Sequence, residues 1–361
     1  MPQCNILKNH MCIRVDGTWS VCCKFMGAPR PKIKNTSFDE FRSSQSFKSV
    51  VDTMESGEWH QGCGNCKWVE ERQRKESLRE YANKTYTEQF GLESIEFSLS
   101  NDCNLKCRMC GPRYSNKWVR LIEENPHLIK TQAHEKYNPF DDNEVELKAS
   151  EILEGVDVSK LKIIKYLGGE PFISSELIEV FKILEDRGVI GQIEFQTNTN
   201  CTLFPEKYEE WLLKFKGLVI TLSIDGYGDL NDYIRDGQPW SVVEAAAVKW
   251  SRFSWRSNTN LIVTPTVQAY NIHDLHNVKK FAIGNKIRYK TQNLLRPFHY
   301  SIDALPREYL EEVRTVENNE DVDYATFNPS YWENLKKFTL DLDLAMNKSI
   351  ADYIPNLYKY F

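Results

Sequence analysis

Hydrophobic and polar residues follow two alternating patterns from about residue 93 onward. Short apolar stretches have the pattern of strands. In one of them, Ile95, Phe97 and Leu99 alternate with polar residues, as in a half-buried strand. Longer stretches between them have helical periodicity. The pattern predicts strands at 94–100, 162–167, 192–197, 217–223, 260–267 and 286–293. It predicts helices near 113–124, 175–187, 206–215, 240–252 and 272–282.

Strands and helices that alternate in this way predict an α/β fold, because parallel strands joined by helices form right-handed crossovers. The six predicted units suffice for a partial (β/α)6 barrel, with its chemistry at the carboxyl ends of the strands. Residues 126–160 are acidic and irregular, which predicts an insertion near that end. Residues 301–361 are aromatic-rich and partly helical in pattern, and they predict a C-terminal extension.

The N-terminal residues have a different pattern, which predicts a β-hairpin. The pair Asp16-Gly17 lies between alternating apolar residues, a strong signal for a hairpin turn. The hairpin would place Cys22 and Cys23 near Cys4.

A helix and a charged segment follow the hairpin. Ser37 and Glu40 have the spacing of a capping box and predict a helix that runs to about Glu55. Residues 67–88 are charged and helical in character, which predicts a bridge to the next domain. The expected parts of the chain are therefore 1–88, 89–300 and 301–361.

Composition and charge exclude several classes of protein. The chain has 361 residues, of which 41% are hydrophobic and 27% are charged, as in ordinary globular proteins. A formal net charge of −5 gives no case for nucleic-acid binding. We find no secretion signal and no apolar run long enough to span a bilayer, so a cytoplasmic protein without membrane contact is expected. The ten cysteines are then expected to be metal ligands or reactive thiols rather than disulfides.

Three cysteines follow the first predicted strand of the α/β region. Cys103, Cys107 and Cys110 have C-x3-C-x2-C spacing on one short loop. Three thiolates suit a [4Fe-4S] cluster, which would keep one iron free of protein ligands. A structural zinc site would need a fourth ligand nearby, and none follows within the loop. A zinc knuckle or three buried structural cysteines remain alternatives.

This cysteine loop resembles the signature of the radical S-adenosylmethionine (SAM) superfamily, in which SAM chelates the open iron. A Gly-Gly-Glu-Pro turn at 168–171 follows the second strand, and a Ser-Ile-Asp-Gly segment at 223–226 follows the fourth. Both resemble SAM-contacting motifs of that family, and their order at successive strand ends strengthens the resemblance. The resemblance implies SAM contacts from Met109, Gly168, Gly169, Glu170, Pro171, Thr197, Asn198, Ser223, Asp225, Arg235, Val263 and Asn271.

The resemblance also implies a role for each contact. Glu170 would receive the SAM amino group, and Arg235 would pair with its carboxylate. Ser223 and Asp225 would contact the ribose hydroxyls, although such residues also form plain turns. Met109 stands where the family often has an aromatic residue beside the adenine, which Val263 and Asn271 would flank; methionine is apolar and polarizable enough for that contact.

A second set of cysteines lies in the N-terminal residues. Cys4, Gly17 and Cys22 form C-x12-G-x4-C, and Cys63 and Cys66 form C-x2-C. The pattern resembles the SPASM/twitch modules that bind auxiliary Fe-S clusters, although such modules usually follow the barrel. It implies one auxiliary cluster, [4Fe-4S] or [2Fe-2S], on these four cysteines.

Two points about this second set stay open. Cys12 and Cys23 remain unassigned, and Cys23 competes with Cys22 because adjacent cysteines on a strand point to opposite faces. A four-cysteine zinc ribbon is the alternative to an Fe-S cluster.

The resemblance implies an oxidoreductase that cleaves SAM reductively to a 5′-deoxyadenosyl radical, which abstracts hydrogen from a substrate carbon. Flavodoxin or ferredoxin would supply the electron. A peptide substrate, as in maturases of ribosomally made peptides, is expected because auxiliary-cluster modules are common among peptide modifiers. The alternatives are a sugar or nucleotide dehydrogenase or epimerase and, from another class, a non-catalytic zinc-binding interaction protein.

Four further residues are candidates for substrate chemistry. Arg296, His299 and Tyr300 follow the sixth strand, at the expected barrel face, and would bind a polar or anionic substrate. Cys201 follows the third strand and would return a hydrogen atom to a substrate radical. Surface or packing roles are the alternative for these residues.

Overall fold

The computed structural model describes residues 2–27, 30–71, 76–130, 147–294, 296–317 and 326–361. The chain divides into two compact units. The first unit comprises the described parts of Met1–Ser100, Asn143–Thr197 and Glu210–Gly217. The second comprises those of Asn101–Asp142, Asn198–Glu209 and Leu218–Phe361. Eight strands belong to one mainly parallel sheet, which confirms the predicted α/β fold.

Five strands of this sheet lie wholly or mostly in the first unit, in the order β2-β1-β3-β5-β6. β1 pairs antiparallel with β2, which confirms the predicted hairpin, and it also pairs parallel with β3. The cysteine-bearing N-terminus therefore adds its hairpin to the strand that precedes the C-x3-C-x2-C loop. The strands are β1 His10–Ile13, β2 Trp19–Ser20, β3 Ser94–Ser98, β5 Ile163–Leu167 and β6 Glu194–Thr199.

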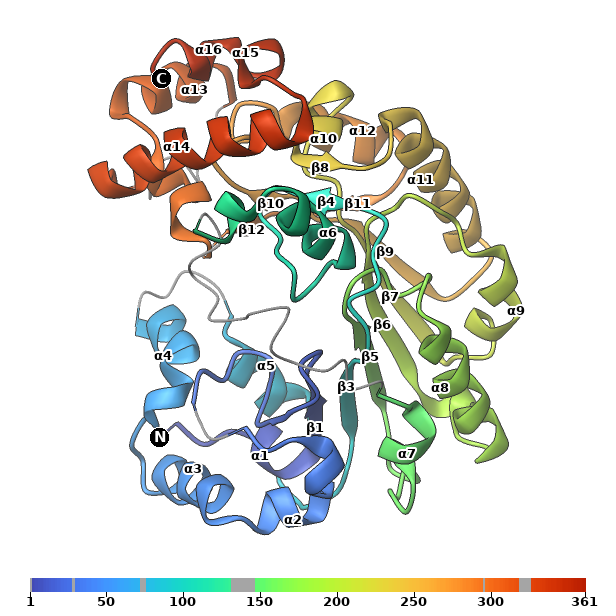
Figure 1. Ribbon diagram of the computed structural model, residues 1–361. Coiled ribbons are helices and arrows are strands. Elements are labelled where there is room, and N and C mark those ends of the chain that lie inside the picture. The colour runs from blue at the N-terminus through green and yellow to red at the C-terminus, as the bar shows by residue number, and fades with distance from the viewer. Residues whose placement is uncertain (1, 28–29, 72–75, 131–146, 295, 318–325) are drawn as a thin grey trace. The chain divides into compact units, whose positions relative to one another are not determined.

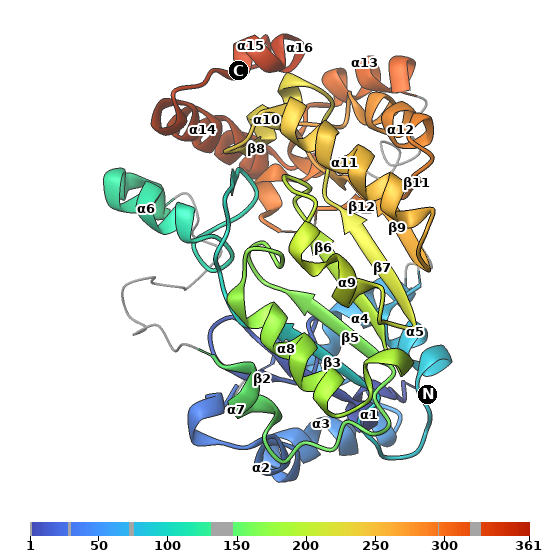
Figure 2. The ribbon, with the colours of Figure 1, turned by 90° about the vertical axis from the view of Figure 1, so that its right-hand side faces the viewer.

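Helix α8 covers one face of the first unit's strands, as Figures 1 and 2 show for β5 and β6. Its Phe181 ring contacts Phe195 of β6 edge-to-face, with centroids 5.1 Å apart. Apolar side chains of the strands therefore face this helix. The helices of this part are α1 Ile6–Asn9, α2 Phe38–Ser43, α3 Gln45–Glu55, α4 Gly64–Glu71, α5 Leu78–Thr85, α7 Ala149–Leu153, α8 Ser175–Asp186 and α9 Glu209–Leu212.

The predicted capping box at the start of α2 is confirmed. The Ser37 hydroxyl accepts from the Glu40 N–H, and the Glu40 carboxylate accepts from the Ser37 N–H. The single helix expected up to Glu55 is wrong, because Ser44 has an extended backbone that ends α2. The Ser44 hydroxyl then accepts from the Phe47 N–H and caps α3.

The second unit contains the parallel strands β7, β9 and β11 and two shorter pairs, β4 with β8 and β10 with β12. Each of the last two predicted strands is split in two. Pro265 lies between β9 and β10, where it lacks the N–H that a continuous strand would need. The strands are β4 Lys106–Cys107, β7 Gly217–Leu222, β8 Arg235–Asp236, β9 Thr259–Val263, β10 Thr266–Val267, β11 Arg288–Tyr289 and β12 Gln292–Asn293.

The predicted C-terminal extension packs into the core of the second unit. Leu335 and Phe338 of α14 join a buried cluster with Trp118 and Leu121 of α6. The aromatic-rich tail is thus part of the core against which Met109 and Cys110 of the cysteine loop pack. The helices are α6 Asn116–Glu124, α10 Asp229–Ile234, α11 Trp240–Ser254, α12 Leu275–Gly284, α13 Arg307–Glu317, α14 Pro329–Met346, α15 Ile350–Tyr353 and α16 Pro355–Tyr358.

The predicted insertion and the possibility of a membrane-spanning helix can each be compared with the described residues. Residues 131–146 of the predicted insertion at 126–160 lie outside the described residues. Among the helices of the described residues, none is both long enough and apolar enough to cross a membrane.

We predict that Ser37→Ala lowers the free energy of unfolding by about 1 kcal/mol, because the first turn of α2 loses its cap. Ser43→Ala is the matched control. The exposed Ser43 hydroxyl donates to the main-chain carbonyls of Asp39 and Glu40 in the same helix, so its loss should cost less than about 0.5 kcal/mol. Urea denaturation measures both, and equal effects of the two substitutions would contradict the capping role.

Candidate functional site

A two-residue antiparallel pairing holds the middle cysteine of the C-x3-C-x2-C loop. β4 lies inside this loop and pairs with β8, so that Cys107 faces Arg235 across the pair. An ion pair of 3.0 Å between Lys106 Nζ and Asp236 Oδ2 supports the same pairing. The Cys110 N–H donates to the Cys107 carbonyl at 2.9 Å and tightens the loop. All these residues belong to the second unit.

Two thiols of the loop receive polar N–H groups. Arg235 Nη1 donates to Cys107 Sγ at 3.7 Å, and Asn200 Nδ2 donates to Cys103 Sγ at 3.9 Å. Burial raises the pKa of the Cys107 thiol, whereas the positive charge of Arg235 lowers it. Donors and cations beside a thiol favour the thiolate that binds iron. The residues present therefore fit an Fe-S cluster.

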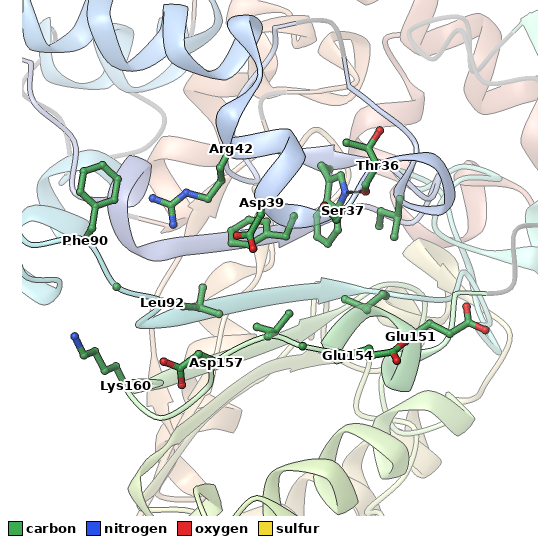
Figure 3. A pocket seen from close by; sticks show the side chains of 17 residues that line it. Thr36, Ser37, Asp39, Arg42, Phe90, Leu92, Glu151, Glu154, Asp157 and Lys160 are labelled. Atoms are coloured by element: carbon green, nitrogen blue, oxygen red, sulfur yellow. Dashed lines mark hydrogen bonds between the residues drawn. The ribbon is translucent and has the colours of Figure 1, made fainter.

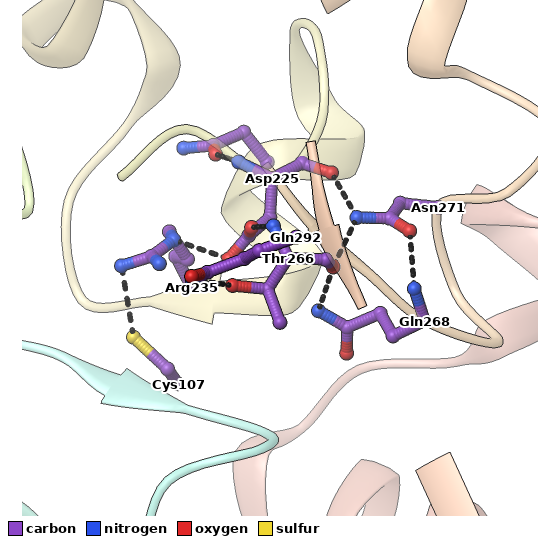
Figure 4. A network of polar contacts seen from close by, with 8 residues as sticks. Cys107, Asp225, Arg235, Thr266, Gln268, Asn271 and Gln292 are labelled. Carbon is purple, nitrogen blue, oxygen red and sulfur yellow. Dashed lines mark hydrogen bonds and ion pairs between the residues drawn. The ribbon is translucent and has the colours of Figure 1, made fainter. Parts of the chain in front are cut away.

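Arg235 belongs to a buried polar network of the second unit (Figure 4). Its Nε contacts Asp225 Oδ2 at 2.6 Å, and the Thr266 N–H donates to Asp225 Oδ1 at 2.6 Å. Asn271 Nδ2 donates to the carbonyls of Asp225 and Thr266, each at 2.9 Å. Asp225 is completely buried. Asp225, Arg235 and Asn271, which the resemblance assigns to three parts of SAM, thus bind one another, and their SAM contacts stay predictions.

The Gly-Gly-Glu-Pro turn of the first unit is shaped by a close backbone approach. Gly168 has a φ of 134°, where a Cβ would clash with the Ser100 carbonyl. The Gly169 N–H donates to the same carbonyl at 3.0 Å. Glu170 is buried, and one of its carboxylate oxygens accepts from the Phe172 N–H at 3.4 Å. Pro171 is buried as well. The SAM contact of this turn stays a prediction.

The other predicted SAM contacts occupy varied environments. The buried Thr197 hydroxyl donates to a main-chain carbonyl of β5 at 2.7 Å, whereas Asn198 is exposed. Ser223 directly follows β7 and is half-buried. Val263 ends β9 and is completely buried. Met109 is partly buried against the core of the second unit. Their SAM contacts stay predictions.

The four candidates for substrate chemistry are mostly buried. Cys201 is completely buried, with a φ of 60°, and its thiol donates to the Val243 carbonyl at 3.7 Å. His299 and Tyr300 are buried with their ring centroids 4.2 Å apart, and Arg296 is exposed. Burial suits a packing function for the first three residues, so their substrate roles stay predictions.

Arg108 is a residue that the sequence did not single out, although it lies between Cys107 and Cys110. Its side chain is completely buried, and its Nη2 contacts Asp343 Oδ1 at 2.5 Å. Its Nε donates to the main-chain carbonyl of Tyr233 at 2.8 Å. Its guanidinium carbon lies 3.6 Å from the centroid of the Tyr233 side-chain ring. Asp343 also accepts from the Tyr233 hydroxyl at 3.0 Å. Arg108 therefore ties the cysteine loop to helix α14.

One sequence signal could have revealed this contact. Asp343 shares a buried helix face with Leu335, Leu342 and Met346, where a carboxylate needs a partner.

The four cysteines predicted as auxiliary ligands line one cavity of the first unit. Cys4, Cys22, Cys63 and Cys66 share it with apolar side chains and with two cationic residues, Lys24 and Arg79. Cys23 is not among the residues that line it. The structure thus brings together four cysteines from three separate segments. Their role as ligands stays a prediction.

The environment of these thiols also fits a cluster. Burial raises the pKa of Cys4 to about 11 and that of Cys63 to about 12. Main-chain N–H groups of Ile6 and Leu7 lower the pKa of Cys4, and two further main-chain N–H groups lower that of Cys66. N–H groups directed at sulfur are a feature of Fe-S sites. Binding of iron would have to displace the thiol protons.

Cys12 and Cys23 lie at a different polar cluster of the first unit. Cys12, Glu96 and Lys165 occupy one cross-strand row on β1, β3 and β5. Cys12 Sγ donates to Glu96 Oε1 at 3.9 Å, and Lys165 Nζ lies 3.6 Å from Glu96 Oε2. Burial and then the Glu96 charge raise the pKa of Cys23 to about 11. The adjacent residues Cys22 and Cys23 therefore lie in two different environments. This difference favours Cys22 as the ligand of the predicted auxiliary cluster.

All ten cysteines lie within the described residues, and none forms a disulfide. In the described ranges, no group of three or more His, Cys, Asp and Glu side chains is placed so that it could hold a metal ion. A four-iron cluster makes a different demand, because each thiolate binds a different iron.

A larger pocket of about 550 Å³ lies elsewhere in the first unit (Figure 3). Arg42 and Lys160 line it together with carboxylates that include Asp39 and Glu154. The Arg42 guanidinium lies 5.2 Å from the centroid of the exposed Phe90 ring. The pocket combines charged walls with aromatic surface, and no sequence motif predicted it.

Comparison with known proteins identifies the class of this chain. Residues 97–282, just over half of the chain, match the radical SAM superfamily. The chain therefore belongs to the radical SAM superfamily, whose members are enzymes that use SAM and a [4Fe-4S] cluster. Its mainly parallel α/β sheet agrees with the predicted partial barrel.

Individual relatives are distant. The chain is 27% identical over 151 residues to the protein YfkA of Bacillus subtilis (strain 168), covering 40% of this chain and 33% of that protein. Similar solved structures include anSMEcpe with bound AdoMet (18% identity, 72% of this chain, 62% of that chain, TM-score 0.42). Streptococcus suis SuiB bound to S-adenosylmethionine is another (19% identity, 62% of this chain, 44% of that chain, TM-score 0.36). Such TM-scores add nothing to the family assignment.

We predict that Asp343→Ala lowers the free energy of unfolding by about 3–5 kcal/mol, because it removes the partner of a completely buried guanidinium. Chemical denaturation of the full chain measures the loss. Glu333→Ala is the matched control on the same helix, because this carboxylate is exposed and pairs with Lys336 one turn away. An Asp343 variant as stable as the control would contradict the anchoring role of Arg108.

Proposed function

We propose that this chain cleaves SAM reductively at a [4Fe-4S] cluster held by Cys103, Cys107 and Cys110. The observation that carries the proposal is the family match around a loop in which N–H donors are directed at two of the three thiols. When bound, the cluster and SAM supply a 5′-deoxyadenosyl radical that abstracts hydrogen from a substrate carbon. The chain's own residues bind and orient these groups and exclude water.

Glu170 is the proposed acceptor for the SAM amino group. Its carboxyl group is buried and one of its oxygens accepts from the Phe172 N–H, so the side chain offers acceptor oxygens in a defined position. The glycines before it keep the backbone free of side chains, as a close ligand approach requires. The nucleoside part of SAM is proposed to contact Thr197, Asn198, Ser223 and Val263.

Cys4, Cys22, Cys63 and Cys66 are the proposed ligands of one auxiliary Fe-S cluster. Their common cavity, its apolar lining and the N–H groups beside Cys4 and Cys66 support this assignment. A zinc site on the same four cysteines is the competing proposal, because four thiolates also suit zinc.

The proposed substrate is a peptide, since auxiliary-cluster modules are common among peptide-modifying members of the superfamily. The runner-up is a sugar or nucleotide that undergoes dehydrogenation or epimerisation. A flavodoxin or ferredoxin is the proposed electron donor. A precursor-peptide gene next to the gene for this chain would favour the peptide.

Alanine at Cys103, Cys107 or Cys110 should abolish the formation of 5′-deoxyadenosine, because the SAM-binding iron is lost. The N-terminal cluster should remain, and iron analysis should detect it. Cys12→Ala is the control, since Cys12 lies outside both proposed ligand sets. Continued 5′-deoxyadenosine formation by a loop variant would overturn the proposed function.

Replacement of Cys4, Cys22, Cys63 and Cys66 together by alanine should lower the iron and sulfide content of the reconstituted chain. Visible absorption should fall in parallel, whereas a zinc site would be colourless in the wild type. A variant with the iron content of the wild type would show that these four cysteines hold no Fe-S cluster. Zinc analysis of the same samples separates the two metals.

A further inference from the structure

Arg235 binds the strand of Cys107 in two ways. Its backbone pairs with Cys107 across β4 and β8, and its side chain donates from Nη1 to Cys107 Sγ at 3.7 Å. The backbone pairing fixes the position of the Arg235 main chain, and the contact with Cys107 Sγ fixes the position of its guanidinium. The guanidinium is therefore aimed at this thiol by the local fold.

Asp225 holds the other end of the guanidinium. Its Oδ2 contacts Arg235 Nε at 2.6 Å, and its Oδ1 accepts from the Thr266 N–H at 2.6 Å. Asn271 and Asn231 fix the Asp225 backbone, through a bond to its carbonyl at 2.9 Å and a bond from its N–H at 3.2 Å. The Asp225 carboxylate has thus a protein partner at each oxygen, and it orients Arg235 rather than a ligand.

Water screens this charge little. The Arg235 side chain is 11% exposed and the Asp225 side chain is completely buried. Charges act more strongly in such a low-dielectric environment, and added salt screens them less than surface charges. A cation and an N–H donor at a cluster sulfur stabilise the reduced cluster, because reduction adds negative charge.

We infer that Arg235 is a positioning residue that acts on Cys107, and that it raises the reduction potential of the cluster proposed to bind there. The inference rests on the proposed function. It assigns Arg235 to Cys107, whereas the family resemblance assigns this residue to the SAM carboxylate; Asp225 engages its Nε and Cys107 its Nη1. The electron itself comes from a flavodoxin- or ferredoxin-type donor, and the cluster takes it up in a one-electron reduction.

The test is a redox titration of the reconstituted full chain without SAM, monitored by the EPR signal of the reduced loop cluster. Arg235→Gln removes the charge and should favour the oxidised cluster by about tenfold, equivalent to a potential about 59 mV lower for one electron. Arg235→Lys keeps the charge but cannot contact Asp225 and Cys107 together, so an intermediate potential is expected. Both shifts should persist at high salt.

Lys106→Gln is the matched control. It removes a positive charge one residue from Cys107 on the same strand pair, but from a side chain that pairs with Asp236. Its potential should stay close to that of the wild type. A shift as large as that of Arg235→Gln would mean that any local charge suffices, and it would overturn the specific role of Arg235.

The dissociation constant for SAM, measured on the same samples, separates the two roles of Arg235. Weaker SAM binding with an unchanged potential would restore the carboxylate contact and overturn the inference. If Arg235→Gln does not keep its cluster, Arg235→Lys carries the test, and a wild-type potential in that variant overturns the inference. A wild-type chain that binds no iron at the loop would instead refute the proposed function.

Discussion

The pairing of β4 with β8 is the constraint on which the cysteine loop depends. Two consecutive residues of the loop, Cys107 and Arg108, contact different parts of the second unit. Cys107 faces Arg235 across the pair, whereas Arg108 enters the core and meets Asp343. The same short segment is thus fixed from both sides, and little freedom remains for the thiol positions. A rigid loop suits a cofactor that needs its ligands placed in advance.

Buried charge is the common feature of this unit. Arg108 and Arg235 are both removed from water, and each has a carboxylate partner, Asp343 or Asp225. Such pairs contribute little net stability, since desolvation offsets most of their attraction. Their value lies in geometry, because an unpaired partner is costly and alternative arrangements are therefore excluded. Through Asp343, the C-terminal helix α14, far away in sequence, holds Arg108 of the cysteine loop in place.

The groups that favour the thiolate differ between the two sets of cysteines. In the second unit, side chains of Arg235 and Asn200 point at the thiols. In the first unit, main-chain N–H groups lower the pKa of Cys4 and Cys66, which line an apolar cavity. Burial raises the pKa of thiols in both, so each site needs donors that favour the thiolate. Different donors also offer a way to set the two proposed clusters to different potentials.

Local patterns in the sequence determined the α/β alternation, the hairpin at Asp16-Gly17, the capping box at Ser37 and the spacing of both cysteine sets. These features depend on residues a few positions apart, so periodicity and turn chemistry encode them. Only the tertiary structure decided that Cys22 rather than Cys23 lines the cavity with the other three cysteines, and that Arg235 contacts Cys107. It also decided the partner of Arg108, which lies 235 residues away. Contacts between distant segments have no periodic signal, because packing of the whole core determines which buried charges meet.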